Sequence, residues 1–272
     1  MMVSMTYQTR VKPARALSSP APAPPSLRAP ESHCLQTNVG RVVSPHILSL
    51  TLQDKSNSRT GDVAIVEAVV AGWTGRDPAA VETHIKELEV LGVKRPATTP
   101  IFYRVSAARL TTADTIEAVG ENSGGEVEFV LLQHQGRLWV GTGSDHTDRE
   151  VEKYGVTVSK QMCDKPIARE FWAYDDVAAH WDRLLLRAHV VEAGKRALYQ
   201  EGTVAAMMDP HALIARHARN GRLPEGTLMF CGTLSAHGGV RATSEFAFEI
   251  EDPVLGRKIA HAYRVRTLPI LG

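Results

Sequence analysis

The residues best suited to chemistry in this 272-residue chain are acidic side chains from two neighbouring stretches. Glu126 and Glu128 are two residues apart in GGEVEFVLL, whose apolar residues indicate a β-strand. Because successive side chains of a strand alternate between its faces, both carboxylates point to the same side. Two like charges this close repel unless a positive charge lies between them, and oxygen ligands suit hard divalent cations. Taken alone, however, such a pair is more typical of a solvated strand face.

A third carboxylate follows the next predicted strand. The stretch RLWVGTG is expected to form a hairpin with the strand of the two glutamates, which returns the chain to the same end of the sheet. Asp145, in SDHTDR, then lies near both of them. His146 is a rival ligand, but three oxygens favour magnesium over zinc. We therefore predict a metal site of Glu126, Glu128 and Asp145, with Mg²⁺ as the ion and Mn²⁺ or Ca²⁺ as alternatives.

The elements that must position these carboxylates are mostly strands. Short segments rich in β-branched and aromatic residues, separated by Gly, Ser or Asn, are typical of strands. The predicted strands are VAIVEAVVAGW (63–73), IFYRV (101–105), TIEAV (115–119), EVEFVLL (126–132), RLWVGTG (137–143), TLMFCGT (227–233), EFAFEIED (245–252) and HAYRVRTL (261–268). The stretch 182–202 is expected to form a hairpin that turns at Glu192 to Lys195.

Two helices complete the predicted domain. Asp77 and Pro78 are an N-cap and first helical residue, and apolar residues recur every three or four positions until Gly92. Asp209 and Pro210 begin the second helix in the same way, and Gly221 is expected just past its end. The sequence thus predicts an α+β fold that is mostly β.

Composition excludes several other classes of protein. Lys plus Arg is 31 and Asp plus Glu is 30, a balance that does not indicate a nucleic-acid surface. The sequence contains no run of eighteen apolar residues, so no membrane span is expected. The three cysteines are Cys34, Cys163 and Cys231, and they contain no CxxC pair that would favour a thiolate zinc site. Unpaired cysteines are typical of a reducing compartment, so we predict a cytoplasmic protein.

The N-terminal residues differ in composition from the rest. Residues 1–44 include the Pro- and Ala-rich APAPPSLRAP, and no acidic residue precedes Glu31. Such a stretch cannot form a packed core, so we predict a disordered extension over 1–44 and one catalytic domain over 45–272. The basic residues and serines of the extension also resemble a transit peptide, which leaves a mitochondrial location as the alternative. Its prolines argue against the helix that such peptides form.

In the order of its motifs, the chain resembles the fumarylacetoacetate hydrolase superfamily over roughly residues 63 to 260. Within that superfamily it is similar to a branch marked by AGWTGRD, GSDHTDRE and SKQ. The matching segments are His84-x-x-Glu87, Pro100 to Arg104, Glu126-x-Glu128, Ser144 to Arg149, Ser159-Lys160 and Gly226 to Thr233. The chain departs from the family at Arg104 (for Lys), Ser144 (for Asn), Cys231 (for Thr) and Leu234 (for Pro). These departures affect the substrate pocket more than the metal ligands, so the substrate is not transferred by analogy.

The resemblance implies a mixed β-sandwich or roll with a few peripheral helices, assembled as a homodimer. It also implies an enzyme that hydrolyses a carbon–carbon bond of a β-diketone or acylpyruvate-like acid. In that enzyme Glu87 would orient His84, His84 would activate water, and Lys160 would balance negative charge near the metal.

The same resemblance suggests where a small carboxylate substrate binds. Gly232 and Thr233 would bind its carboxylate, and Arg76 and Arg104 are candidate anion clamps because of their planar guanidinium. An ion pair at the helix start is the alternative for Arg76, and a surface position the alternative for Lys160. Two other functions stay open: a 2-oxo acid decarboxylase, isomerase or hydratase, and a binding protein without catalysis.

Overall fold

The structure, a computed structural model, describes residues 44–90 and 95–271. These residues belong to one compact unit, Val43–Gly272. The predicted extension over 1–44 lies, apart from Ser44, outside the described residues, and so does Gly92. Among the described residues, no helix is both long and apolar enough to cross a membrane.

The larger of two main sheets has eight strands in the order β2-β1-β12-β9-β8-β15-β3-β4. It is a mixed sheet, because β1 pairs with β12 and β15 with β3 in parallel while its other pairs are antiparallel. The strands are β1 (His46–Gln53), β2 (Ser58–Ile65), β3 (Glu67–Gly72), β4 (Ile101–Val105), β8 (Val127–His134), β9 (Arg137–Ser144), β12 (Glu170–Ala173) and β15 (Thr227–Thr233).

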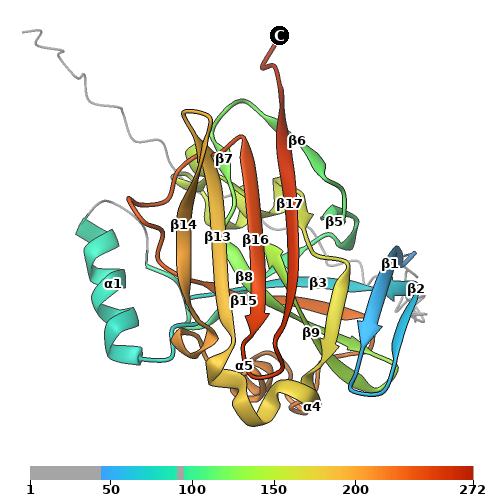
Figure 1. The fold of residues 1–272 in the computed structure, drawn as a ribbon. Helices are drawn as coiled ribbons and strands as arrows, with labels where there is room; N and C mark the ends of the chain where they lie inside the picture. Colours follow the sequence, from blue (N-terminus) through green and yellow to red (C-terminus); the bar gives the residue numbers. More distant parts are fainter. Residues whose placement is uncertain (1–43, 91–94, 272) are drawn as a thin grey trace, which may run out of the picture. The chain divides into compact units, whose positions relative to one another are not determined.

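The second sheet has five strands in the order β14-β13-β16-β17-β6 and lies across the first (Figure 1). Its strands are β6 (Thr115–Val119), β13 (Leu185–Glu192), β14 (Lys195–Thr203), β16 (Glu245–Asp252) and β17 (Arg257–Leu268). The predicted hairpin is confirmed as β13–β14. Ala193 and Gly194 form its two-residue turn with φ of 48° and 74°, the left-handed backbone that such tight turns require.

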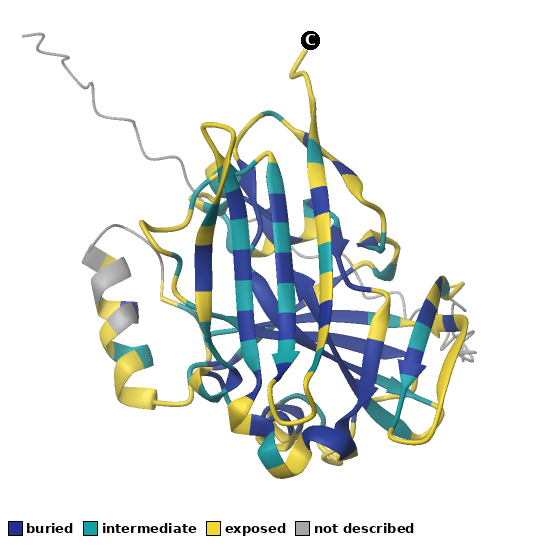
Figure 2. Ribbon diagram, in the orientation of Figure 1, coloured by how far each residue is buried: buried dark blue, intermediate teal, exposed yellow. Residues whose placement is uncertain are grey.

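The main core lies between the two sheets. Strands β13 and β16 alternate buried and half-buried residues along their length (Figure 2). Their buried residues Leu186 and Phe248 belong to one apolar cluster with Phe129 of β8. The other face of the eight-stranded sheet has its own apolar cluster, which includes Val130 and Phe230. Strand β8 is therefore buried on both faces, and any polar group on it must find a partner inside the protein.

Short elements connect these sheets. The helices are α1 (Pro78–Val90), α2 (Arg149–Glu152), α3 (Val156–Met162), α4 (Tyr174–Val177) and α5 (Pro210–His217). The two-residue strands are β5 (Leu110–Thr111), β7 (Ser123–Gly124), β10 (Thr147–Asp148) and β11 (Lys165–Pro166), and 3₁₀ turns cover 107–109, 178–183 and 204–206. Helix α1 stands at the side of the domain, apart from the two sheets (Figure 1).

The predicted fold class is confirmed, and two predicted boundaries are corrected. The stretch 63–73 is two strands, because β2 ends at Ile65 and β3 begins at Glu67. The amides of Val66 and Glu67 both donate to the carbonyl of Gly226, and the two strands then pair with different partners. Helix α1 begins at Pro78 as predicted, but α5 ends at His217, four residues before Gly221.

Candidate metal centre

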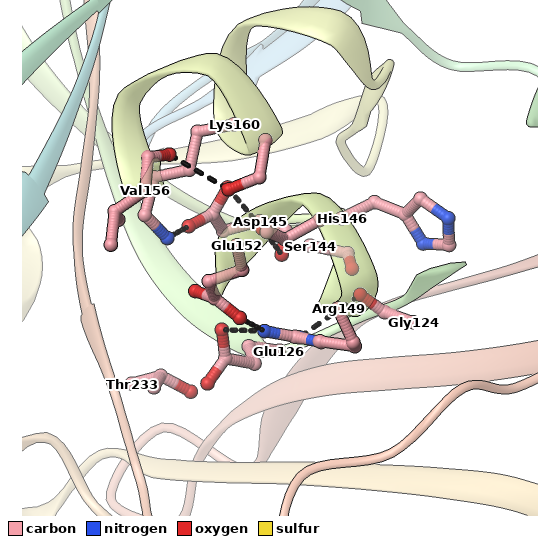
Figure 3. Close-up of polar contacts among 12 residues, drawn as sticks. Gly124, Glu126, Ser144, Asp145, His146, Arg149, Glu152, Val156, Lys160 and Thr233 are labelled. Carbon is pink, nitrogen blue, oxygen red and sulfur yellow. Dashed lines mark hydrogen bonds and ion pairs between the residues drawn. The ribbon is translucent and has the colours of Figure 1, made fainter. Parts of the chain in front are cut away.

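The three predicted metal ligands come from one hairpin. Strands β8 and β9 pair in antiparallel register with Val127 opposite Ser144, and the amide of Asp145 donates to the carbonyl of Glu126 at 3.0 Å. This register brings Asp145, which follows β9, beside Glu126, which precedes β8 (Figure 3). The hairpin that the sequence predicted is therefore present, and it joins the two acidic stretches.

Glu128 is held by the main chain of the neighbouring strand β15. The residue is 3% exposed, and its Oε2 accepts a hydrogen bond from the amide of Gly232 at 2.6 Å. Gly232 has φ of 103°, and a Cβ there would collide with Thr74 Oγ1, so the position requires glycine. Burial and the nearby charge of Asp145 raise the pKa of Glu128 well above its ordinary value.

Asp145 is fully buried between two lysines. Lys160 of α3 donates to its Oδ2, and Nζ of Lys165 in β11 lies 3.2 Å from its Oδ1. Burial alone would raise the pKa of Asp145, but the two ammonium groups outweigh burial and hold this pKa below its ordinary value. Asp145 is therefore an ionised carboxylate inside the protein.

Lys165 is a site residue that the sequence analysis missed. It is fully buried, its ammonium also donates to the carbonyl of His146, and burial lowers its pKa. A buried lysine needs a carboxylate partner, which Asp145 supplies. The available signal was a lysine in KPIA, next to an apolar strand, where a solvated lysine is out of place.

Glu126 lies at the edge of this cluster and contacts Arg149. Nη1 of Arg149 is 3.2 Å from Oε2 of Glu126 and 3.0 Å from Oε2 of Glu152 (Figure 3). Asp148 caps α2 by accepting from the amides of Glu150 and Val151, which orients the helix that begins at Arg149. The carboxylate of Glu126 is thereby paired with the guanidinium of Arg149.

The rival ligand His146 points away from the carboxylates (Figure 3). Its Nδ1 is 2.9 Å from the hydroxyl of Tyr263, which is also 2.9 Å from Ser144 Oγ. Burial, together with the nearby charge of Lys165, lowers the pKa of His146 to about 3, so the ring is neutral. The ring therefore belongs to the packing behind the site.

The other predicted substrate-binding residues have partners of their own. Arg76 donates to both carboxylate oxygens of Asp182 at 2.7 and 2.8 Å, which is the ion pair considered as its alternative. Arg104 donates from Nη1 to the carbonyls of Ala68 and Val105 at 2.8 and 2.9 Å. These contacts involve none of the three carboxylates of the site.

Thr233 lies beside Val127, whereas the predicted catalytic pair is on helix α1. The hydroxyl of Thr233 donates to the carbonyl of Val127, the residue between Glu126 and Glu128, at 2.7 Å. His84 and Glu87 lie on α1, but their side chains are outside the described part of the chain. Their predicted dyad stays a prediction.

The donor set fits a hard divalent cation. The described residues contain no ready-made cluster of three His, Cys, Asp or Glu that could hold a metal ion. In this structure Lys160 instead contacts Asp145, and Arg149 contacts Glu126. Glu128 instead accepts from a main-chain amide, and its raised pKa shows that more positive charge would stabilise its ionised form. Carboxylate oxygens are the ligands that Mg²⁺ and Ca²⁺ prefer, so these residues are chemically suited to hold such an ion.

Comparisons with known proteins agree with this architecture. Residues 71–263 match the sequence profile of a family described as a protein of unknown function, DUF2848. A search among curated proteins found no match. A crystal structure of Cg1458 with an inhibitor is similar at 17% identity and a TM-score of 0.56, covering 78% of this chain and 81% of that one.

Another similar structure is 2-keto-3-deoxy-D-arabinonate dehydratase complexed with magnesium and 2,5-dioxopentanoate. It is 17% identical with a TM-score of 0.51, and the match covers 75% of this chain and 74% of that chain. The apo form of the same dehydratase matches at 16% identity and a TM-score of 0.54, over 78% and 77% of the two chains. At these identities the likeness shows the fold, which is fumarylacetoacetate hydrolase-like.

Proposed function

The chain belongs to the DUF2848 family, and we propose that it is a divalent-metal-dependent enzyme acting on a small 2-oxo or diketo acid. The main support is the convergence of Glu126, Glu128 and Asp145 at one end of the β8–β9 hairpin. The side chains of Glu126 and Asp145 are 13% and 1% exposed and Glu128 is 3% exposed, and a cation stabilises the ionised form of a buried carboxylate. The fold adds support, because one protein that shares it was crystallised with magnesium and 2,5-dioxopentanoate.

Glu126, Glu128 and Asp145 would hold the ion. When bound, a divalent cation of this kind polarises a substrate carbonyl and stabilises negative charge that develops during reaction. The ammonium of Lys160, which already contacts Asp145, balances negative charge at the same place. Mg²⁺ is the proposed ion, with Mn²⁺ and Ca²⁺ as alternatives of the same oxygen-ligand chemistry.

Hydrolysis of a carbon–carbon bond is the reaction we propose for this site. His84 and Glu87 are one helical turn apart on α1, so their side chains can face the same ligand. The carboxylate of Glu87 would orient the His84 ring, whose free nitrogen takes a proton from water as that water attacks the substrate carbonyl. The carbon–carbon bond then breaks with its electron pair on the leaving enolate carbon, which takes up a proton. The products are two acids, or an acid and a ketone, depending on which side of the diketone is cleaved.

Dehydration, decarboxylation or isomerisation of a 2-oxo acid is the second candidate. It is favoured by the dehydratase among proteins of this fold. All of these reactions develop charge next to a carbonyl and use the same carboxylates, but they do not need a water nucleophile. The His84→Ala variant separates them: we expect it to lose hydrolysis by about 10²-fold or more and to retain lyase activity.

A substrate panel tests the proposal directly. The chain, stripped with a chelator, is assayed with acylpyruvates, oxaloacetate and related 2-oxo acids, with and without Mg²⁺ or Mn²⁺. We expect turnover only with metal, on at least one diketo or 2-oxo acid. If no member of the panel turns over while the metal still binds, a binding protein without catalysis is the better description.

The location and assembly of the protein are part of the same proposal. We propose a cytoplasmic homodimer with its catalytic domain over 45–272, supported by the family resemblance and by the unpaired cysteines. Sedimentation of the full chain distinguishes a dimer from a monomer. A mitochondrial location requires residues 1–44 to direct a fluorescent fusion to that organelle.

A further inference from the structure

A closed ring of hydrogen bonds surrounds Val127, the residue between Glu126 and Glu128. The amide of Val127 donates to Oε1 of Gln200 at 2.9 Å, and Nε2 of Gln200 donates to the hydroxyl of Thr233 at 2.8 Å. That hydroxyl donates in turn to the carbonyl of Val127 at 2.7 Å, which closes the ring. We propose that Gln200 is a positioning residue, which sets the placement of the Glu126 and Glu128 carboxylates through this ring.

The orientation of the Gln200 amide follows from its partners. The amide of Val127 can only donate, so it faces the oxygen of Gln200. The carbonyl of Leu234 can only accept, and it lies 2.6 Å from Nε2. The two ends of the side chain are therefore distinguished by main-chain groups of β8 and of the residue that follows β15, and a flipped amide would lose both bonds.

The ring lies where the β8–β15 ladder is interrupted. The register between these strands shifts between Phe230 and Thr233, and the amide of Gly232 turns to the carboxylate of Glu128. An interrupted ladder leaves main-chain groups of a buried strand without their strand partners. Gln200, which belongs to β14 of the other sheet and is fully buried, supplies a hydrogen-bond partner for the amide of Val127.

The ring controls the two peptide groups next to the proposed ligands. The amide of Val127 belongs to the peptide that follows Glu126, and its carbonyl belongs to the peptide that precedes Glu128. Holding both groups sets the direction in which the two carboxylates leave the strand. Partners that orient metal ligands in this way typically change metal affinity by about 10- to 100-fold when they are removed.

This role also assigns the hydroxyl of Thr233. A threonine hydroxyl has one hydrogen to donate, and in Thr233 it is donated to the carbonyl of Val127. The hydroxyl therefore has none left to donate to a substrate carboxylate. We assign Thr233 to the ring, in place of the substrate contact that the family resemblance suggested.

The experiment compares variants of the full chain in the absence of substrate. Gln200→Met and Thr233→Val keep side-chain volume, and each removes hydrogen bonds of the ring. The double variant carries both substitutions, each of which already opens the ring. Thr233→Ser keeps the hydroxyl and is the conservative rescue. Tyr199→Phe is the matched control, because it removes a hydrogen bond of the neighbouring buried residue, whose hydroxyl accepts from the amide of Arg241.

Two readouts are measured on each variant. Hydrogen exchange at the Val127 amide reports on the ring without any metal, and Mn²⁺ titration reports on the carboxylates. We expect Gln200→Met and Thr233→Val each to speed exchange and to weaken Mn²⁺ binding by about 10-fold or more. The double variant should be no worse than either, because members of one network are not additive. Thr233→Ser and Tyr199→Phe should match the wild type.

The outcomes separate this inference from the proposed function on which it rests. Unchanged Val127 exchange in Gln200→Met overturns the ring, and so does unchanged Mn²⁺ affinity in that variant when the wild type binds Mn²⁺. A Tyr199→Phe variant that loses as much affinity as Gln200→Met overturns it as well, because the effect is then general. A wild-type chain that binds no Mn²⁺ refutes the metal-dependent function, and with it the positioning role, even if the ring is intact.

Discussion

Two fully buried aspartates have different surroundings in this molecule. Asp252 lies at the end of β16, where its Oδ1 accepts from the amides of Val254 and Leu255 at 3.1 Å. The same oxygen is 2.9 Å from Nε2 of His180, and Oδ2 is 3.3 Å from Nε of Arg257. Main-chain amides of the turn into β17 are thus part of its hydrogen-bonding shell, and they cannot leave without breaking the turn.

Asp145 has a different set of partners. Its carboxylate faces the ammonium groups of Lys160 and Lys165, and the carboxylates of Glu126 and Glu128 are near enough to interact with these charges. A lysine side chain can move where a main-chain amide cannot, so a divalent cation can compete for these oxygens. Burial alone therefore does not distinguish the two aspartates; the proposed metal ligand differs by its surplus of acidic neighbours and by partners that can move aside.

The largest expected effect separates the two aspartates by metal affinity. Asp145→Asn removes a charged ligand and is expected to weaken Mn²⁺ binding by an order of magnitude or more, whereas Asp252→Asn should leave it unchanged. Calorimetric titration of the two variants and the wild type checks this. Equal losses in both variants would mean that Asp145 acts only through the stability of the domain.

The next effect concerns the buried lysine of the site. Lys165→Met leaves the Asp145 carboxylate with one ammonium partner, and breaking a buried pair in this way costs about 3 to 5 kcal/mol. Urea unfolding measures the loss. Lys153→Met is the control, because the ion pair of Lys153 with Glu150 is largely exposed, and we expect no measurable change. A small loss in Lys165→Met would show that Lys160 alone is enough to hold Asp145.

The contribution of Asp252 to the free energy of unfolding should depend on pH. Burial alone would raise its pKa, but the Leu255 amide and His180 hold the pKa of Asp252 below its ordinary value. A lowered folded pKa contributes stability above the unfolded value of about 3.9 and loses it as pH falls through the folded pKa. Asp252→Asn should therefore cost roughly 1.5 to 3 kcal/mol at pH 7, and the difference from the wild type should shrink in acid. A constant difference down to pH 2 would contradict this account.

The smallest effect is expected where a carboxylate pairs in solvent. Asp182 is 59% exposed in its pair with Arg76, so Asp182→Asn should change the free energy of unfolding by less than about 1 kcal/mol, and less still in high salt. Thermal unfolding at two salt concentrations measures it. If the variant instead changes the KM for a substrate, Arg76 is available to bind an anion, as the sequence analysis suggested.

Local patterns predicted the elements of this protein well. Strand β8 was predicted from its apolar residues, the β13–β14 hairpin from its Ala-Gly turn, and the start of α1 from Asp77 and Pro78, and each is present. Their spacing along the chain was enough, because strand alternation, tight turns and helix caps depend on neighbouring residues. The division of the stretch 63–73 at Val66 was not predictable in this way, since apolar residues continue on both sides of it.

The acidic residues and their approach through one hairpin were thus determined by the sequence itself, because a hairpin joins stretches that are adjacent along the chain. Only the tertiary structure decided that Lys165 neutralises Asp145, that His146 turns to Tyr263, and that Gln200 crosses from the other sheet to hold Val127. Each of these contacts joins a buried polar group to a residue from another element. The periodicity of a strand or helix in the sequence does not predict such a pairing, because it arises when buried polar groups must find hydrogen-bond partners in the folded core.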